Sequence, residues 1–93
     1  MRQATFHSLV RIPTTPETIE SVRTELSTYL EQEVTNCAGF VMVQMLIDEP
    51  QTVILADITW ESRAVWDAFV NSGKLDDLPG QDPEVLELNA VEL

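Results

Sequence analysis

His7 is the side chain best suited to proton transfer in this sequence of 93 residues, which contains one histidine. An imidazole can accept and release a proton near neutral pH, so His7 is a candidate general base. The residue type permits this chemistry without requiring it, because a strand histidine can also be partly buried with a backbone partner. We name His7 as the candidate catalytic residue and keep the structural interpretation beside it.

Four aromatic side chains are candidates for lining a cavity: Tyr29, Trp60, Trp66 and Phe69. Trp66 and Phe69 fall on neighbouring positions of one predicted helix face, where an aromatic pair more often belongs to a core. Trp60 can pack the start of that helix against a sheet or form the wall of a cavity. Tyr29 can place its hydroxyl at the edge of the same cavity.

Asp57 interrupts the apolar run 53–60, which is expected to be a central strand. A buried carboxylate needs a partner or a raised pKa, so Asp57 is either part of a site or a member of a structural ion pair. The structural interpretation pairs it with Arg11 on a neighbouring strand or with a residue across a dimer. Gln44 poses a similar question, and we expect its amide to form hydrogen bonds across an interface.

The composition excludes several classes of function. Sixteen acidic against five basic residues give a net charge of -11, which opposes binding to nucleic acid or to an anionic membrane. Cys37 is the one cysteine, and the sequence contains no phosphate-binding loop, nucleophile elbow or spaced set of metal ligands. We therefore expect no metal site. The polar start and the lack of a long apolar run predict a cytoplasmic protein.

The hydrophobic pattern predicts six elements in the order βαββαβ. In the first strand, Phe6, Ser8, Val10 and Ile12 alternate with Thr5, His7, Leu9 and Arg11. The predicted strands are 4–12, 40–47, 53–60 and 84–93, and the predicted helices are 15–34, capped by Thr15, and 62–73, capped by Ser62 and ended by Gly73. Residues 74–83 are expected to form a loop that can contain one helical turn. This pattern predicts an α+β fold with a four-stranded antiparallel sheet in a single domain over residues 1–93.

The second and third strands are apolar on both sides, which has a consequence for assembly. We group Phe40, Met42 and Leu46 on one side of the second strand, against Val41, Val43, Met45 and Ile47 on the other. Two helices of ~10 Å diameter cover only one face of a sheet about 19 Å wide. A sheet that is apolar on both faces is typical of one that is buried on both faces. We therefore predict a homodimer formed through the open faces of two sheets.

At these residues the sequence resembles a known family. Gly39-Phe40, the hairpin Asp48-Glu49-Pro50 and above all the run 60–65 (WESRAV) are similar to the antibiotic-biosynthesis-monooxygenase family of dimeric α+β barrels. The resemblance covers nearly the whole chain. It implies a ferredoxin-like subunit with a substrate pocket between the helices and the sheet. An ungapped match to the family also implies that His7 points toward the helices, beside Trp66 and Phe69.

The resemblance implies a cofactor-independent monooxygenase that acts on a small quinol-like or anthrone-like aromatic, with His7 as its base. This sequence departs from the family at Ala56, where the anthrone oxygenases have an asparagine, and it shows no equivalent of their pocket arginine. A non-catalytic dimer that binds a small molecule or is structural is the alternative. Haem binding is a third possibility, disfavoured because the axial histidine of the haem-degrading branch corresponds to Pro79.

Overall fold

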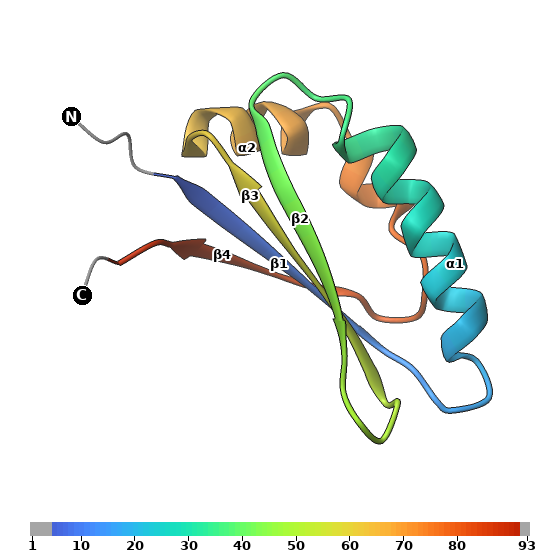
Figure 1. Cartoon of the computed structure of the whole chain (residues 1–93). Helices are drawn as coiled ribbons and strands as arrows, with labels where there is room; N and C mark the ends of the chain where they lie inside the picture. Colours follow the sequence, from blue (N-terminus) through green and yellow to red (C-terminus); the bar gives the residue numbers. More distant parts are fainter. Residues whose placement is uncertain (1–4, 92–93) are drawn as a thin grey trace.

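Residues 5–91, which the computed structural model describes, form a four-stranded antiparallel sheet with its helices on one side (Figure 1). The elements are β1 (Phe6–Pro13), α1 (Ile19–Tyr29), η1 (Leu30–Val34), β2 (Phe40–Ile47), β3 (Val53–Trp60), α2 (Arg63–Asn71), η2 (Lys74–Asp77) and β4 (Glu84–Asn89). The strands lie in the order β2-β3-β1-β4. This arrangement confirms the predicted α+β class and the ferredoxin-like βαββαβ topology.

The helix boundaries follow local sequence signals, with one correction. Thr15 is not the N-cap of α1, because the helix begins at Ile19 after a turn in which the Thr15 carbonyl accepts bonds from the amides of Thr18 and Ile19. Ser62 does cap α2, since its hydroxyl accepts a hydrogen bond from the amide of Val65. Gly73 follows α2 with a φ of 81°, a left-handed conformation that suits glycine.

The first helix widens over its last turn. η1 is a π-helix, and it closes with a bond from the Thr35 amide to the Leu30 carbonyl at 2.9 Å. Leu30 and Val34 in this turn are both buried, so the apolar stripe of α1 continues through it. Glu31 and Glu33, on the other side of the turn, carry the acidic charge.

The core lies between the sheet and the two helices. Its fully buried large side chains are Phe6, Val10, Ile12, Leu26, Val34, Ile54, Ile58, Trp60 and Trp66. Ser8 is buried with them because its hydroxyl accepts a hydrogen bond from the Trp60 indole at 2.9 Å. The indole N–H would otherwise be a buried donor without a partner.

The alternation predicted for β1 is correct, but the prediction of which side of the strand faces the helices is wrong. Phe6, Ser8 and Val10 face the helices, whereas His7 and Leu9 lie on the other side of the sheet. The predicted position of His7 against Trp66 and Phe69 is therefore corrected. Each side of β1 contains at least one polar and one apolar residue, so alternation alone does not choose between them.

The side of the sheet away from the helices, called here the open face, combines apolar and polar residues. From the strand register it contains His7, Leu9, Arg11, Met42, Gln44, Leu46, Val53, Leu55, Asp57, Thr59, Glu84, Leu86 and Leu88. Met42, Leu46, Leu86 and Leu88 are each more than 40% exposed. An irregularity between Phe40 and Met42 turns Phe40 toward the helices, so these two do not share a face as predicted.

Candidate functional site

A cleft of about 510 Å³ lies where the loop after η1 meets α2 and the start of η2. It is lined by Cys37, Ala38, Ala64, Val65, Ala68, Phe69, Ser72 and Lys74, and we call it the Phe69–Lys74 cleft. Gly39 lets the loop pass close to α2, because a Cβ at this position would lie 2.6 Å from a methyl group of Val65. The walls are mostly apolar, so the cleft suits a small apolar ring that carries few polar groups.

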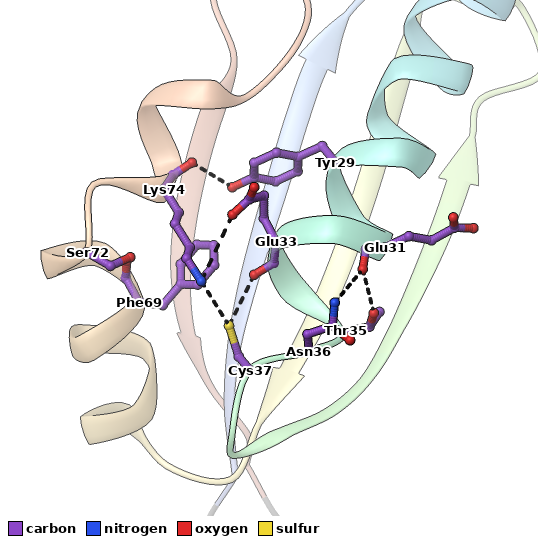
Figure 2. Close-up of polar contacts among 9 residues, drawn as sticks. All are labelled: Tyr29, Glu31, Glu33, Thr35, Asn36, Cys37, Phe69, Ser72 and Lys74. Atoms are coloured by element: carbon purple, nitrogen blue, oxygen red, sulfur yellow. Dashed lines mark hydrogen bonds and ion pairs between the residues drawn. The ribbon is translucent and has the colours of Figure 1, made fainter.

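Lys74 brings a positive charge to this apolar surface (Figure 2). Its Nζ lies 3.9 Å from the Cys37 sulfur and 5.9 Å from the centre of the Phe69 ring. The Glu33 carboxylate approaches the same Nζ to 4.0 Å. The ammonium therefore stands between an aromatic ring, a thiol and a carboxylate, within reach of a polar group on a bound ring.

The turn that carries Cys37 is held by hydrogen bonds to η1 (Figure 2). The side chains of Thr35 and Asn36 both donate to the Glu31 carbonyl, and the Cys37 thiol donates to the Glu33 carbonyl at 3.1 Å. These bonds fix the thiol at the edge of the cleft. The thiol hydrogen is engaged by the Glu33 carbonyl, while the sulfur accepts from the Lys74 ammonium.

Tyr29 connects α1 to the backbone of Lys74. Its hydroxyl donates to the Lys74 carbonyl at 3.0 Å, and the residue is 7% exposed. Burial, together with the nearby groups Glu33, Asp77 and Cys37, raises the pKa of Tyr29 well above its ordinary value of 10.0. Tyr29 thus stands as a neutral donor that positions the start of η2.

We expect Tyr29 to resist ionisation in the folded protein. Because its folded pKa is raised, its contribution to stability is fully present below pH 10.0 and is lost as the pH rises above that value. The sequence has one tyrosine, so tyrosinate absorbance reports this residue alone. The absorbance should rise together with unfolding measured by circular dichroism. Ionisation near pH 10 in a fully folded sample would contradict the assignment, and Tyr29→Phe should lack this alkaline loss.

The structure separates the predicted aromatic residues. Phe69 lines the cleft, whereas Trp60 and Trp66 are 0% and 1% exposed in the core. The Trp60 ring centre lies 5.8 Å from that of Trp66 and 5.1 Å from that of Phe69. The Trp66 indole donates to the Glu87 carboxylate at 2.6 Å. These side chains occupy the space between helices and sheet where the resemblance implied a pocket.

His7 lies on the open face in a polar cluster, away from the cleft. Its Nδ1 is 3.1 Å from the Asp57 carboxylate and 3.3 Å from the Thr59 hydroxyl. The partner of Asp57 is therefore His7 and not Arg11, and the predicted backbone partner of His7 is replaced by side chains. A general base must lie within hydrogen-bond reach of the proton it removes, and nothing in the described residues places His7 at the cleft.

Two residues that line the cleft, Cys37 and Lys74, were not predicted from the sequence, and neither was Glu33, whose carboxylate reaches Lys74 from outside it. Cys37 and Lys74 are 37 positions apart and meet only through the fold. One local signal was available for Lys74, because it directly follows Gly73 at the end of α2, where the chain must turn. Lys74 is also one of only five basic residues in this acidic sequence, so its positive charge is a rare feature.

The strand order and the placement of both helices define a ferredoxin-like α+β subunit with a small, mostly apolar cleft. Solved structures with this fold include a monooxygenase from the gene ActVA-Orf6 of Streptomyces coelicolor, in complex with nanaomycin D. It is 17% identical to this chain, with a TM-score of 0.76 over 98% of this chain and 91% of that chain.

Two further structures have the same fold. The heme-degrading protein Rv3592 from Mycobacterium tuberculosis is 17% identical, with a TM-score of 0.76 over 98% of this chain and 96% of its own. An antibiotic biosynthesis monooxygenase is 16% identical, with a TM-score of 0.70 over 94% and 99%. No family model and no curated protein matches the sequence. The chain therefore has the fold of the antibiotic-biosynthesis-monooxygenase proteins, as the resemblance implied.

Two kinds of feature are not found in the described residues. No helix within residues 5–91 has the length and apolarity that a membrane span requires. In the same part of the chain, no group of three or more histidine, cysteine or acidic side chains is arranged to hold a metal ion.

Proposed function

We propose that this protein is a monooxygenase that oxidises a small quinol-like or anthrone-like aromatic in the Phe69–Lys74 cleft, without a metal or an organic cofactor. The observation that carries the proposal is the combination of an apolar wall containing Phe69 with the Lys74 ammonium at the same cleft. The shared fold with the Streptomyces monooxygenase that binds nanaomycin D supports it.

The reaction balances with dioxygen as the only oxidant. A ring CH₂ group of an anthrone gains one oxygen atom as a carbonyl, and its two hydrogens leave with the other oxygen atom as water. The substrate first loses a proton to give an electron-rich anion, which passes an electron to dioxygen. The proton passes to water at the open side of the cleft, because the Cys37 thiol already donates to the Glu33 carbonyl, and Lys74 stabilises the anion.

Oxygen consumption with a panel of anthrones and hydroquinones tests this function. Ala68→Trp should reduce uptake by at least about tenfold, because position 68 is exposed on α2 and a tryptophan there would fill the cleft. Val70→Trp is the matched control, since Val70 is exposed on the same helix and does not line the cleft. His7→Asn should leave uptake unchanged. No uptake by the wild-type protein above a buffer control would reject the proposed activity.

A non-catalytic binding protein is the second candidate. It is favoured by the small number of proton-exchanging side chains among the residues that line the cleft, namely Cys37 and Lys74. Saturable quenching of tryptophan fluorescence by an anthrone, without oxygen uptake, would identify a binding protein. The core placement of Trp60 and Trp66, close to Phe69, makes this fluorescence sensitive to the cleft. Haem is a poorer candidate, because the one histidine of the sequence lies on the open face.

We further propose that the protein is a homodimer of single-domain subunits over residues 1–93, located in the cytoplasm. The open face supports the dimer, because it leaves Met42, Leu46, Leu86 and Leu88 more than 40% exposed across two separate strands. Large apolar side chains left exposed at both edges of one sheet face favour an interaction surface. A second copy of the same face is its simplest partner.

A further inference from the structure

We propose that Glu33 and Lys74 form an exchangeable ion pair, in which an ionised oxygen of the bound aromatic replaces the Glu33 carboxylate beside the Lys74 ammonium. The inference rests on the proposed role of the Phe69–Lys74 cleft as the ligand site and narrows the ligand class to planar aromatic oxyanions, such as phenolates and enolates. Glu33 is then an internal competitor of the ligand.

The position of Lys74 fits this role. Its backbone carbonyl is held by the Tyr29 hydroxyl at 3.0 Å, so the side chain extends from an anchored point (Figure 2). Its ammonium lies 5.9 Å from the centre of the Phe69 ring and 3.9 Å from the Cys37 sulfur, and both residues line the cleft. An aromatic ring in the cleft can therefore place a ring oxygen at the ammonium.

Glu33 is a weak and displaceable partner. Its carboxylate is 4.0 Å from the Lys74 nitrogen, and the two side chains are 34% and 38% exposed, so solvent screens their attraction. Glu33 does not line the Phe69–Lys74 cleft. It lines a neighbouring hollow of about 400 Å³, together with Tyr29 and Asp77. The carboxylate can thus move toward that solvent space when another anion reaches Lys74.

The net charge of the protein makes the site selective. A charge of -11 repels anions at long range, so a simple ion such as acetate gains too little from one lysine to bind well. An aromatic oxyanion also buries its ring against Phe69 and the alanines of the cleft. The site should therefore accept anions that carry an apolar ring and exclude those that do not.

Anaerobic titration with 1,8-dihydroxyanthraquinone tests the exchange, because ionisation of this dye changes its visible spectrum. Wild-type protein should bind the dye and shift its ionisation to lower pH. Lys74→Met should abolish that shift and weaken binding by about tenfold or more, whereas Lys74→Arg should retain part of it. Glu33→Gln should tighten binding by a few-fold, since it removes the competitor.

Glu31→Gln is the matched control, because it removes the same charge from the same turn and Glu31 does not reach Lys74. Anthraquinone, which has no hydroxyl, should bind all four variants and the wild type equally. Equal effects of Glu33→Gln and Glu31→Gln, or a normal spectral shift in Lys74→Met, would overturn the exchange while leaving the cleft as a binding site. No dye binding by the wild type would overturn the cleft itself. A Lys74-dependent shift without oxygen uptake would reject only the proposed oxygenase activity.

Discussion

Replacing Leu86 by glutamate is expected to convert the proposed dimer into a monomer. Leu86 lies on β4 in the open face, directly opposite Leu9 of β1, and is 41% exposed in the single subunit. A two-fold axis would bury a copy of the new carboxylate from each subunit. Burying an unpaired charge costs several kcal/mol, so dimer affinity should fall by about two orders of magnitude or more.

Analytical ultracentrifugation of wild type and variant over a range of concentrations measures this change. Val70→Glu is the matched control, because Val70 is an exposed apolar residue of α2, outside the open face. It should leave the sedimentation coefficient of the dimer unchanged. Circular dichroism should show the Leu86→Glu subunit folded, since the side chain is already partly in water. A wild-type protein that sediments as a monomer at micromolar concentration would reject the dimer.

Replacing Trp60 by alanine is expected to cost about 3 to 5 kcal/mol of unfolding free energy, the range for a large buried aromatic. Trp60 is 0% exposed, and its ring packs against Phe40, Trp66 and Phe69. The substitution also removes the donor that satisfies the buried Ser8 hydroxyl. Small domains are stable by only about 5 to 15 kcal/mol, so this loss is a large fraction of the total free energy of unfolding.

Urea unfolding followed by circular dichroism measures the loss. Trp60→Phe is the conservative comparison, because it keeps an aromatic ring and should cost less than the alanine variant. Under conditions where Trp60→Phe is folded, its affinity for an anthrone should match that of the wild type, since Trp60 does not line the cleft. A normal stability combined with weakened ligand binding would instead restore Trp60 to the binding role that the sequence suggested.

The topology could be predicted from the sequence because each element carries its own signal. The apolar stripe from Ile19 to Val34, the Ser62 cap and the Gly73 turn are local features, and each fell within a few residues of its place. The orientation of β1 could not be predicted in this way. Leu9 is apolar on the open face and Ser8 is polar in the core, so the usual contrast between faces is blurred at the middle of the strand.

The candidate site was harder to predict than the fold, for a related reason. Phe69, which the sequence singled out, lines the cleft, but the polar side chains at the cleft come from the ends of two different helices. Only the docking of η2 onto α1, through Tyr29 and the Lys74 carbonyl, brings Lys74 near Cys37 and Glu33. No spacing in a single sequence encodes a contact made by the packing of separate elements.

The π-helical turn at η1 has a consequence for how this protein tolerates change. A π-helical bond spans one residue more than an α-helical bond, so the chain from Leu30 to Thr35 contains a residue that an ordinary turn would not need. The positions of Glu33 and Cys37 therefore depend on the number of residues in this turn as well as on their side chains. Loss of a single residue from this turn would rotate everything that follows relative to α1. The site is thus more sensitive to a deletion in η1 than to most substitutions there.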